Sequence, residues 1–156
     1  MDASWGIAVI GSGPAGFYSV GELFRQESFS IKVDMFDRLP TPFGLVRGGV
    51  APDHQKIKSV TKIYSRIAEN PNFRFFGNVE FGRDIFQSDL LDHYDAVIYS
   101  VGSPADRALG VPGEDLSGSH SATEFVAWYN GHPDFSNHKF DLSVKNAFVI
   151  GMGNVA

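Results

Sequence analysis

The residues with the clearest chemical potential lie near the start of the chain, in the stretch GSGPAG. Its glycines occupy positions 11, 13 and 16, which is the GxGxxG spacing of turns that bind dinucleotides. Gly11 permits a sharp turn after a strand, Gly13 lets backbone approach a diphosphate, and Gly16 lets the next helix pack closely. The start of that helix would add unpaired N–H groups and a partial positive charge. The pattern therefore predicts a diphosphate site here.

A carboxylate follows at the distance that such a site requires. Asp37 lies 21 positions beyond Gly16, and about 20 are expected for a carboxylate that accepts hydrogen bonds from ribose hydroxyls. The alternative is that Asp37 ends its strand and faces water. Asp34 has the same chemistry but falls inside the expected strand, so it is the weaker candidate. Because a carboxylate disfavours a 2′-phosphate, we expect FAD or NAD at this site and not NADP.

The elements that must position these residues follow from the apolar patterns. They predict an α/β fold with a mainly parallel, Rossmann-like sheet, which begins with a βαβ unit. Ser121 and Glu124 predict a capping box, and Gly131 predicts the end of that helix. The expected strands are 6–11, 31–37, 73–82, 95–102 and 146–151, and the expected helices are 14–26, 52–70 and 121–131.

Composition excludes several classes of function. The 156 residues are 43% hydrophobic and 20% charged, as in an ordinary globular protein. The net charge of −5 disfavours binding to nucleic acid or to a membrane surface. No apolar run approaches the ~18 residues of a membrane-spanning helix. The chain has no cysteine, which excludes a dithiol or a thiolate metal site within it. The histidines at positions 93, 120, 132 and 138 lack metal-ligand spacing, so we expect no metal site from them.

The segment PTPFGLVRGGVAPDH, which follows the second expected strand, bears on the choice between FAD and NAD. It is rich in proline and glycine and has no helical or strand periodicity. An NAD dehydrogenase has no need of a rigid segment at this point. A flavin needs backbone laid along its ribityl chain and ring, with few bulky side chains intruding. The segment therefore favours FAD.

Seven motifs occur in a characteristic order: GSGPAGFY, LPTPFGLVRGGVAPDH, FFGNVEFGRD, YDAVIYSVG, PGEDLSG, FVAWYNGHP and VIGMGNVA. In this order the chain resembles the adrenodoxin reductase family, which includes actinobacterial NADPH–ferredoxin reductases, over essentially its whole length. The resemblance implies electron transfer from NADPH through FAD to a ferredoxin- or adrenodoxin-type iron–sulfur protein. It implies that residues 1–104 are the first part of an FAD-binding domain. Residues 105–156 would then be a linker and the start of an inserted NADP-binding domain, in an amino-terminal piece of a longer protein.

The resemblance also implies roles for individual residues. Asp53 and His54 would tune the flavin or relay a proton, although Asp53 could instead cap a helix. Asp37 stands where the family usually has Glu. The implied FAD contacts, beside Gly11 and Gly16, are Gly13, Pro14, Ala15, Asp37, Leu45, Phe81 and Gly102. The implied NADP contacts are Gly151, Gly153, Asn154, Val155 and Ala156.

Other interpretations stay open at this point. The chain could belong to another flavoprotein with two dinucleotide domains, such as a monooxygenase or a dithiol reductase, or be a nucleotide-binding piece without activity. Lys58, Lys62 and Arg66 would form a basic stripe on helix 52–70, which either docks an acidic ferredoxin or is simply solvated. We expect a cytoplasmic bacterial protein or, alternatively, a mature mitochondrial matrix form. The chain alone is expected to bind FAD weakly and to lack NADPH oxidation.

Overall fold

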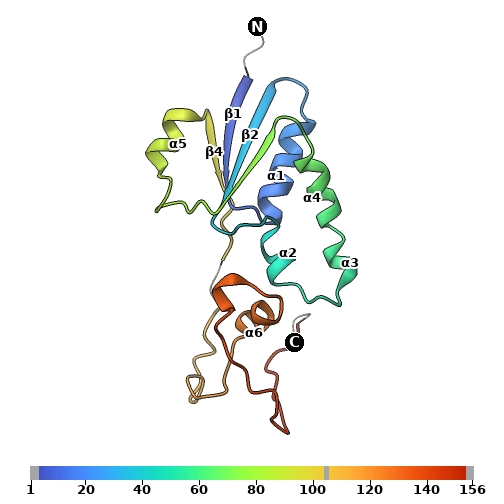
Figure 1. The fold of residues 1–156 in the computed structure, drawn as a ribbon, viewed down its shortest axis with the longest axis vertical. Helices are drawn as coiled ribbons and strands as arrows, with labels where there is room; N and C mark the ends of the chain where they lie inside the picture. Colours follow the sequence, from blue (N-terminus) through green and yellow to red (C-terminus); the bar gives the residue numbers. More distant parts are fainter. Residues whose placement is uncertain (1–3, 104–105, 154–156) are drawn as a thin grey trace. The chain divides into compact units, whose positions relative to one another are not determined.

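The computed structural model describes residues 4–103 and 106–153. The chain forms two compact units, Met1–Gly102 and Ser103–Ala156, and Figure 1 shows the elements of each. None of the helices within the described ranges combines the length and the apolar character that a membrane crossing requires. The functional assignment of residues 1–104 and 105–156 stays a prediction.

The first unit is built on a four-stranded parallel sheet with the order β3-β2-β1-β4. The predicted α/β fold with a parallel sheet is therefore confirmed. Ile7 of β1 pairs with Val33 of β2 on one side and with Ala96 of β4 on the other. The two central strands are apolar because both of their faces are covered. The strands are β1 (Ser4–Ile10), β2 (Ser30–Asp37), β3 (Phe73–Gly77) and β4 (Ala96–Tyr99).

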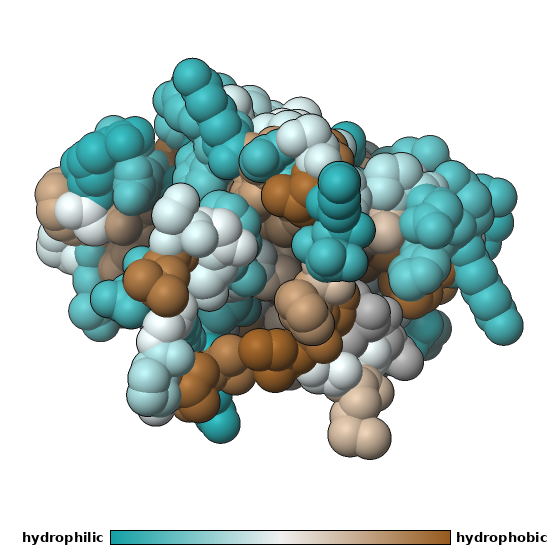
Figure 2. Space-filling model, turned by 90° about the horizontal axis from the view of Figure 1, so that it is seen from below, coloured by the Kyte–Doolittle hydropathy of each residue, from teal (hydrophilic) through white to brown (hydrophobic). Residues whose placement is uncertain are grey.

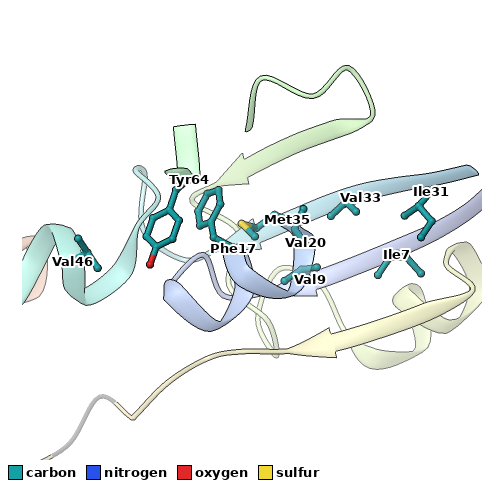
Figure 3. Close-up of a cluster of buried hydrophobic side chains, with 9 residues drawn as sticks. All are labelled: Ile7, Val9, Phe17, Val20, Ile31, Val33, Met35, Val46 and Tyr64. Atoms are coloured by element: carbon teal, nitrogen blue, oxygen red, sulfur yellow. The ribbon is translucent and has the colours of Figure 1, made fainter. Parts of the chain in front are cut away.

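Helices cover the two faces of this sheet. Helices α1 (Pro14–Arg25) and α4 (Thr61–Ala68) pack on one face, where Phe17 and Tyr64 stack with ring centroids 4.9 Å apart (Figure 3). Helix α5 (Gln87–His93) packs on the other face through Leu90. Alternate residues of β1 supply the two cores, since successive side chains of a strand point to opposite faces. Ile7 and Val9 belong to the first core, and Ala8 and Ile10 to the second.

The predicted helix 52–70 is wrong as a single element. The chain forms α3 (Gln55–Lys58) and then α4, with a turn at residues 59–60. Side-chain hydroxyls compete for carbonyls at the break: Thr61 Oγ1 donates to Lys58 O at 2.8 Å, and Ser59 Oγ donates to Lys56 O at 2.6 Å. The predicted basic stripe is divided as a result, because Lys58 lies on the shorter helix.

Two further differences concern the segment after β3. The predicted strand 73–82 ends at Gly77, and Asn78 follows with a φ of 59°, which is outside the range of a strand. Helix α5 was not predicted. The sequence feature that indicates the start of this helix is Asp89. Its carboxylate accepts a hydrogen bond from the Phe86 N–H at 2.8 Å and so satisfies a backbone donor at the helix N-terminus.

In the second unit, helix α6 (Ala122–Tyr129) has the predicted capping box. Ser121 Oγ accepts from the Glu124 N–H at 3.1 Å, and Glu124 Oε2 accepts from the Ser121 N–H at 3.2 Å. A 3₁₀ turn, η1 (Pro133–Phe135), follows. Phe125, Trp128 and Phe140 pack as an aromatic cluster.

The predicted strand 146–151 does not form. The structure assigns no regular element to these residues, and Phe148 is 93% exposed. A strand exists through hydrogen bonds to a neighbouring strand, and none of the described strands pairs with this segment. Apolar side chains are also exposed elsewhere on the surface, as the brown atoms in Figure 2 show. The predicted beginning of a second Rossmann sheet is therefore not seen in residues 106–153.

Candidate dinucleotide-binding site

The first glycine of the GSGPAG turn is required by both conformation and space. Gly11 follows β1 with a φ of 99°, a region that L side chains rarely adopt. A Cβ added there would lie 2.4 Å from the carbonyl oxygen of Ser100, at the end of β4. The Gly11 N–H donates to Phe36 O at 2.8 Å. The turn is thus fixed between the carboxyl ends of three neighbouring strands.

The third glycine lets α1 approach this turn. A Cβ on Gly16 would lie 2.5 Å from Gly11 O and 2.9 Å from Ser100 Oγ. Ser100 Oγ in turn donates to the carbonyl oxygens of Ile10 and Gly11, at 3.1 and 2.9 Å. Gly16 therefore has the packing role that the spacing predicts.

The second glycine differs from its neighbours because it faces open space. A Cβ added to Gly13 would have no atom within 4 Å. Gly13 is the N-cap of α1, which has Pro14 in its first turn, no side-chain cap and no acidic residue within that turn. The start of this helix keeps unpaired N–H groups and a partial positive charge. This opening fits a diphosphate, which needs close backbone approach and N–H donors.

Asp37 lies at the carboxyl end of β2, against the glycine turn. Its Oδ2 accepts hydrogen bonds from the Ser12 N–H at 2.8 Å and from Ser12 Oγ at 2.5 Å. Its Oδ1 accepts from the Leu39 N–H at 2.9 Å. The structure thus brings the predicted carboxylate to the turn, and its contact with a ribose stays a prediction.

Asp34 has a different role. Its side chain is 8% exposed, and it pairs with Arg74 through two hydrogen bonds of 2.7 and 2.5 Å. Tyr94 donates a third, at 2.7 Å. Burial alone would raise the pKa of Asp34, but the hydrogen bonds from Arg74 and Tyr94 outweigh it and hold the pKa below the usual value of an aspartate. Asp34 therefore has a structural role, in which it joins β2 to Arg74 and Tyr94.

The proline- and glycine-rich segment lies directly on the glycine turn. The Phe43 N–H donates to Ser12 O at 3.0 Å, and a Cβ on Gly44 would lie 2.9 Å from Gly13 Cα. Phe43 has a φ of 92°, which costs a non-glycine residue about 1–3 kcal/mol. Its ring packs against Phe17 and Tyr64, at 5.3 and 5.7 Å between centroids. Those contacts hold the strained residue in place.

A short helix, α2 (Gly44–Gly48), begins at this contact and was not predicted. Leu45, in its first turn, is 63% exposed. Lys58 Nζ donates to the carbonyl oxygens of Val46 and Arg47, at 3.3 and 3.2 Å, where a cation is favoured by the helix dipole. Lys58 is thus bound within the unit.

Other residues of the segment were missed by sequence reasoning. The Arg47 guanidinium lies 5.2 Å from the centroid of the Phe43 ring, and its Nε donates to Pro42 O at 2.8 Å. Ser12 was also missed, although it lies between two of the motif glycines. Ser12 has no local signal, since its partners Asp37 and Phe43 lie far away in the sequence. The partners of Arg47 are close in the sequence, but the pattern of hydrophobic residues does not record these contacts.

The remaining candidates of the first unit lie in the connections between helices and strands. Phe81 is half-buried and packs against Tyr99, with 5.3 Å between ring centroids. Gly102 has a φ of 72° and open space beside it.

Asp53 and His54, the residues expected to tune the flavin, are both exposed. The alternative in which Asp53 caps a helix is wrong, because His54 is the N-cap of α3 and makes no side-chain cap bond.

The NADP candidates belong to the second unit. Gly151 has a φ of 144°, and a Cβ on Gly153 would meet no atom within 4 Å. Asn154, Val155 and Ala156 lie outside the described residues. The contact of this turn with NADP stays a prediction.

Known proteins are similar to this chain in both sequence and fold. NADPH-ferredoxin reductase FprA of Mycobacterium leprae (strain TN) is 53% identical over 154 residues, which cover 96% of this chain and 34% of the relative. NADPH:adrenodoxin oxidoreductase, mitochondrial, of Arabidopsis thaliana is 49% identical over 151 residues, with 96% and 31% covered. This chain is a homologue of the adrenodoxin reductase-type NADPH–ferredoxin reductases. The resemblance inferred from the seven motifs is thereby confirmed.

Solved structures agree with this homology. The structure of Mycobacterium tuberculosis FprA in complex with NADPH matches with a TM-score of 0.81 and 50% identity, over 86% of this chain and 31% of the other. Histamine dehydrogenase from Rhizobium sp. 4-9 matches with a TM-score of 0.56 at 21% identity, over 74% of this chain and 17% of the other, which shows a shared fold alone. No protein-family model matches the chain. The chain spans about a third of the length of the reductases that it matches.

Proposed function

We propose that this chain forms the FAD-binding part of an NADPH–ferredoxin reductase, in which electrons pass from NADPH through FAD to a ferredoxin-type iron–sulfur protein. The observation that carries the proposal is the open space beside Gly13, at the uncapped start of α1, with residues 43–44 laid against the same turn. The names of the homologues, NADPH-ferredoxin reductase and NADPH:adrenodoxin oxidoreductase, support it.

The chain's own residues would divide the binding of FAD among them. The start of α1 would donate backbone N–H groups to the diphosphate, and Asp37 would accept from the adenosine ribose. The exposed Leu45 side chain and the turn at Gly102 would lie along the rest of the cofactor. Bound FAD would supply hydride acceptance and the release of single electrons. Asp53 and His54 are the proposed residues for tuning the flavin, and both are exposed.

The second unit would contribute the start of the NADP site, at Gly151 and Gly153. Mycobacterial relatives at 53% and 51% identity favour a cytoplasmic setting, whereas the plant relative at 49% is mitochondrial by name. The bacterial cytoplasm is accordingly our proposal, with the mitochondrial matrix as the alternative.

The test is a titration of the chain with FAD, followed by flavin fluorescence. Gly13→Ala places a methyl group where the diphosphate would lie and should weaken binding at least about tenfold, equivalent to about 1.4 kcal/mol. Gly153→Ala is a matched control, because its added Cβ also meets no atom within 4 Å. Gly153 belongs to the second unit, whereas the proposed FAD site is in the first. The control should leave the affinity for FAD unchanged.

The fold should survive the Gly13→Ala substitution. The residue has a φ of −77° and a ψ of −175°, which alanine adopts without strain. Circular dichroism should therefore show unchanged melting. If FAD fails to bind the wild-type chain, or binds Gly13→Ala as tightly as the wild type, the proposal is wrong.

A further inference from the structure

Each polar group of Ser12 forms a hydrogen bond with another residue of the protein. It is fully buried, its N–H and its hydroxyl both donate to Asp37 Oδ2, at 2.8 and 2.5 Å, and its carbonyl oxygen accepts from the Phe43 N–H at 3.0 Å. It lies between the glycine that makes the turn and the glycine that faces open space. A buried hydroxyl with a charged partner is held firmly, since leaving that partner unsatisfied is costly.

These bonds limit what Asp37 can do for a ligand. An ionised carboxylate offers about four lone-pair sites on its two oxygens. Ser12 takes both sites of Oδ2, and the Leu39 N–H takes one site of Oδ1 at 2.9 Å. Among the residues that the structure describes, no other donor to this carboxylate is seen, which leaves one acceptor site, on Oδ1. A ribose presents two neighbouring hydroxyls, so a single free site can accept from only one of them.

We infer that Ser12 is a specificity-determining residue: by occupying Oδ2 of Asp37, it restricts that carboxylate to one of the two hydroxyls of the nucleotide's ribose. The inference rests on the proposed function, which it deepens. The short side chain of Asp37 contributes to the restriction, because it keeps the carboxylate within hydrogen-bonding distance of the turn. Ser12 is thus a positioning residue that acts on the ligand through Asp37.

A substitution of Ser12 should change how many ribose hydroxyls Asp37 can bind. Ser12→Ala removes the hydroxyl donor and keeps the N–H, which frees one acceptor site on Oδ2. The second ribose hydroxyl then gains an acceptor. A merely structural role for Ser12 would lower the affinity for all nucleotides together and would not change the contribution of one hydroxyl relative to the other.

The experiment titrates the full chain with ADP, 2′-deoxy-ADP and 3′-deoxy-ADP, followed by chemical-shift changes in NMR spectra. For the wild type, one deoxy analogue should bind about tenfold more weakly than ADP, the loss expected for a hydrogen bond to a charged group. The other should bind within about twofold of ADP. For Ser12→Ala, both deoxy analogues should bind about tenfold more weakly than ADP.

Ser100→Ala is the matched control. Ser100 Oγ also donates to the glycine turn, at Ile10 O and Gly11 O, but not to Asp37. Its loss should change the affinity for all three nucleotides by the same factor and preserve the difference between the deoxy analogues. The wild-type measurement tests the inference even if a variant fails to fold.

The outcomes separate this inference from the proposed function. Equal weakening by both deoxy analogues in the wild type, or weakening by neither, overturns the inference and leaves the nucleotide site in place. An unchanged asymmetry in folded Ser12→Ala overturns the role of Ser12. No binding of ADP to the wild type overturns the inference and the proposed nucleotide site together.

Discussion

The most direct physical prediction concerns Gly16→Ala and its effect on stability. The added Cβ would lie 2.5 Å from Gly11 O and 2.9 Å from Ser100 Oγ, so either the helix or the turn must move. Overpacking of this kind costs about 3 kcal/mol when the opposing atom is backbone. Alanine recovers at most about 1 kcal/mol of helix propensity. The expected net loss in the free energy of unfolding is therefore about 2 kcal/mol.

Urea unfolding, followed by far-ultraviolet circular dichroism, measures this loss. With a denaturant dependence of about 1–3 kcal/mol per molar urea, the midpoint of Gly16→Ala should fall by roughly 1 M. The same change should lower the affinity for FAD, because displacement of the turn also moves the start of α1.

Gly21→Ala is the control in the same helix. Its added Cβ would meet only the Ile67 side chain, with Cδ1 at 3.0 Å, and the end of an isoleucine side chain can move. This variant should be at least as stable as the wild type, since it gains helix propensity without a backbone clash. Equal midpoints for Gly16→Ala and Gly21→Ala would refute the packing argument.

Three further predictions concern charged and capping groups. Burial and neighbouring groups raise the pKa of Tyr64 and of Tyr94 to about 12, so phenolate absorbance should show both ionising well after an ordinary tyrosine near pH 10. The contribution of Tyr94 to stability is therefore present below about pH 10 and lost as the pH rises toward 12. Stability measured over this range should decline less in Tyr94→Phe. The lowered pKa of Asp34 means that its contribution is present above about pH 4 and lost as the pH falls further. Acid titration of Asp34→Asn should accordingly show a shallower decline, and an unchanged one would contradict the assignment. Ser121→Ala should destabilise α6 by about 1 kcal/mol through loss of the cap, measured as lost helical signal in mild urea.

Much of the fold could be predicted because its signals are local. The apolar run before Gly11, the glycine spacing and the βαβ order lie within the first 40 residues, and the structure forms β1, α1 and β2 there. The capping box at Ser121 is equally local, since its two partners are three residues apart. The position of Asp37 at the turn follows from the parallel register, which brings the carboxyl ends of neighbouring strands together.

The errors arose where hydrogen bonds that the hydrophobic pattern does not record decide the outcome. Residues 146–151 have the composition of a strand, but composition supplies no partner for its hydrogen bonds. Helix 52–70 has a continuous apolar periodicity, and hydroxyl bonds at Ser59 and Thr61 interrupt it. The pattern of hydrophobic residues cannot register such bonds.

The sequence by itself determined a parallel α/β unit with a glycine turn at the start of a helix and a carboxylate near it, because periodicity and spacing act over a few residues. Only the tertiary structure decided how that carboxylate is used. Ser12 and Asp37 are 25 residues apart, and Phe43 reaches the same turn from the segment beyond β2. Their hydrogen bonds exist only after the strands are paired. Folding therefore sets which acceptor sites of Asp37 stay free for a ligand.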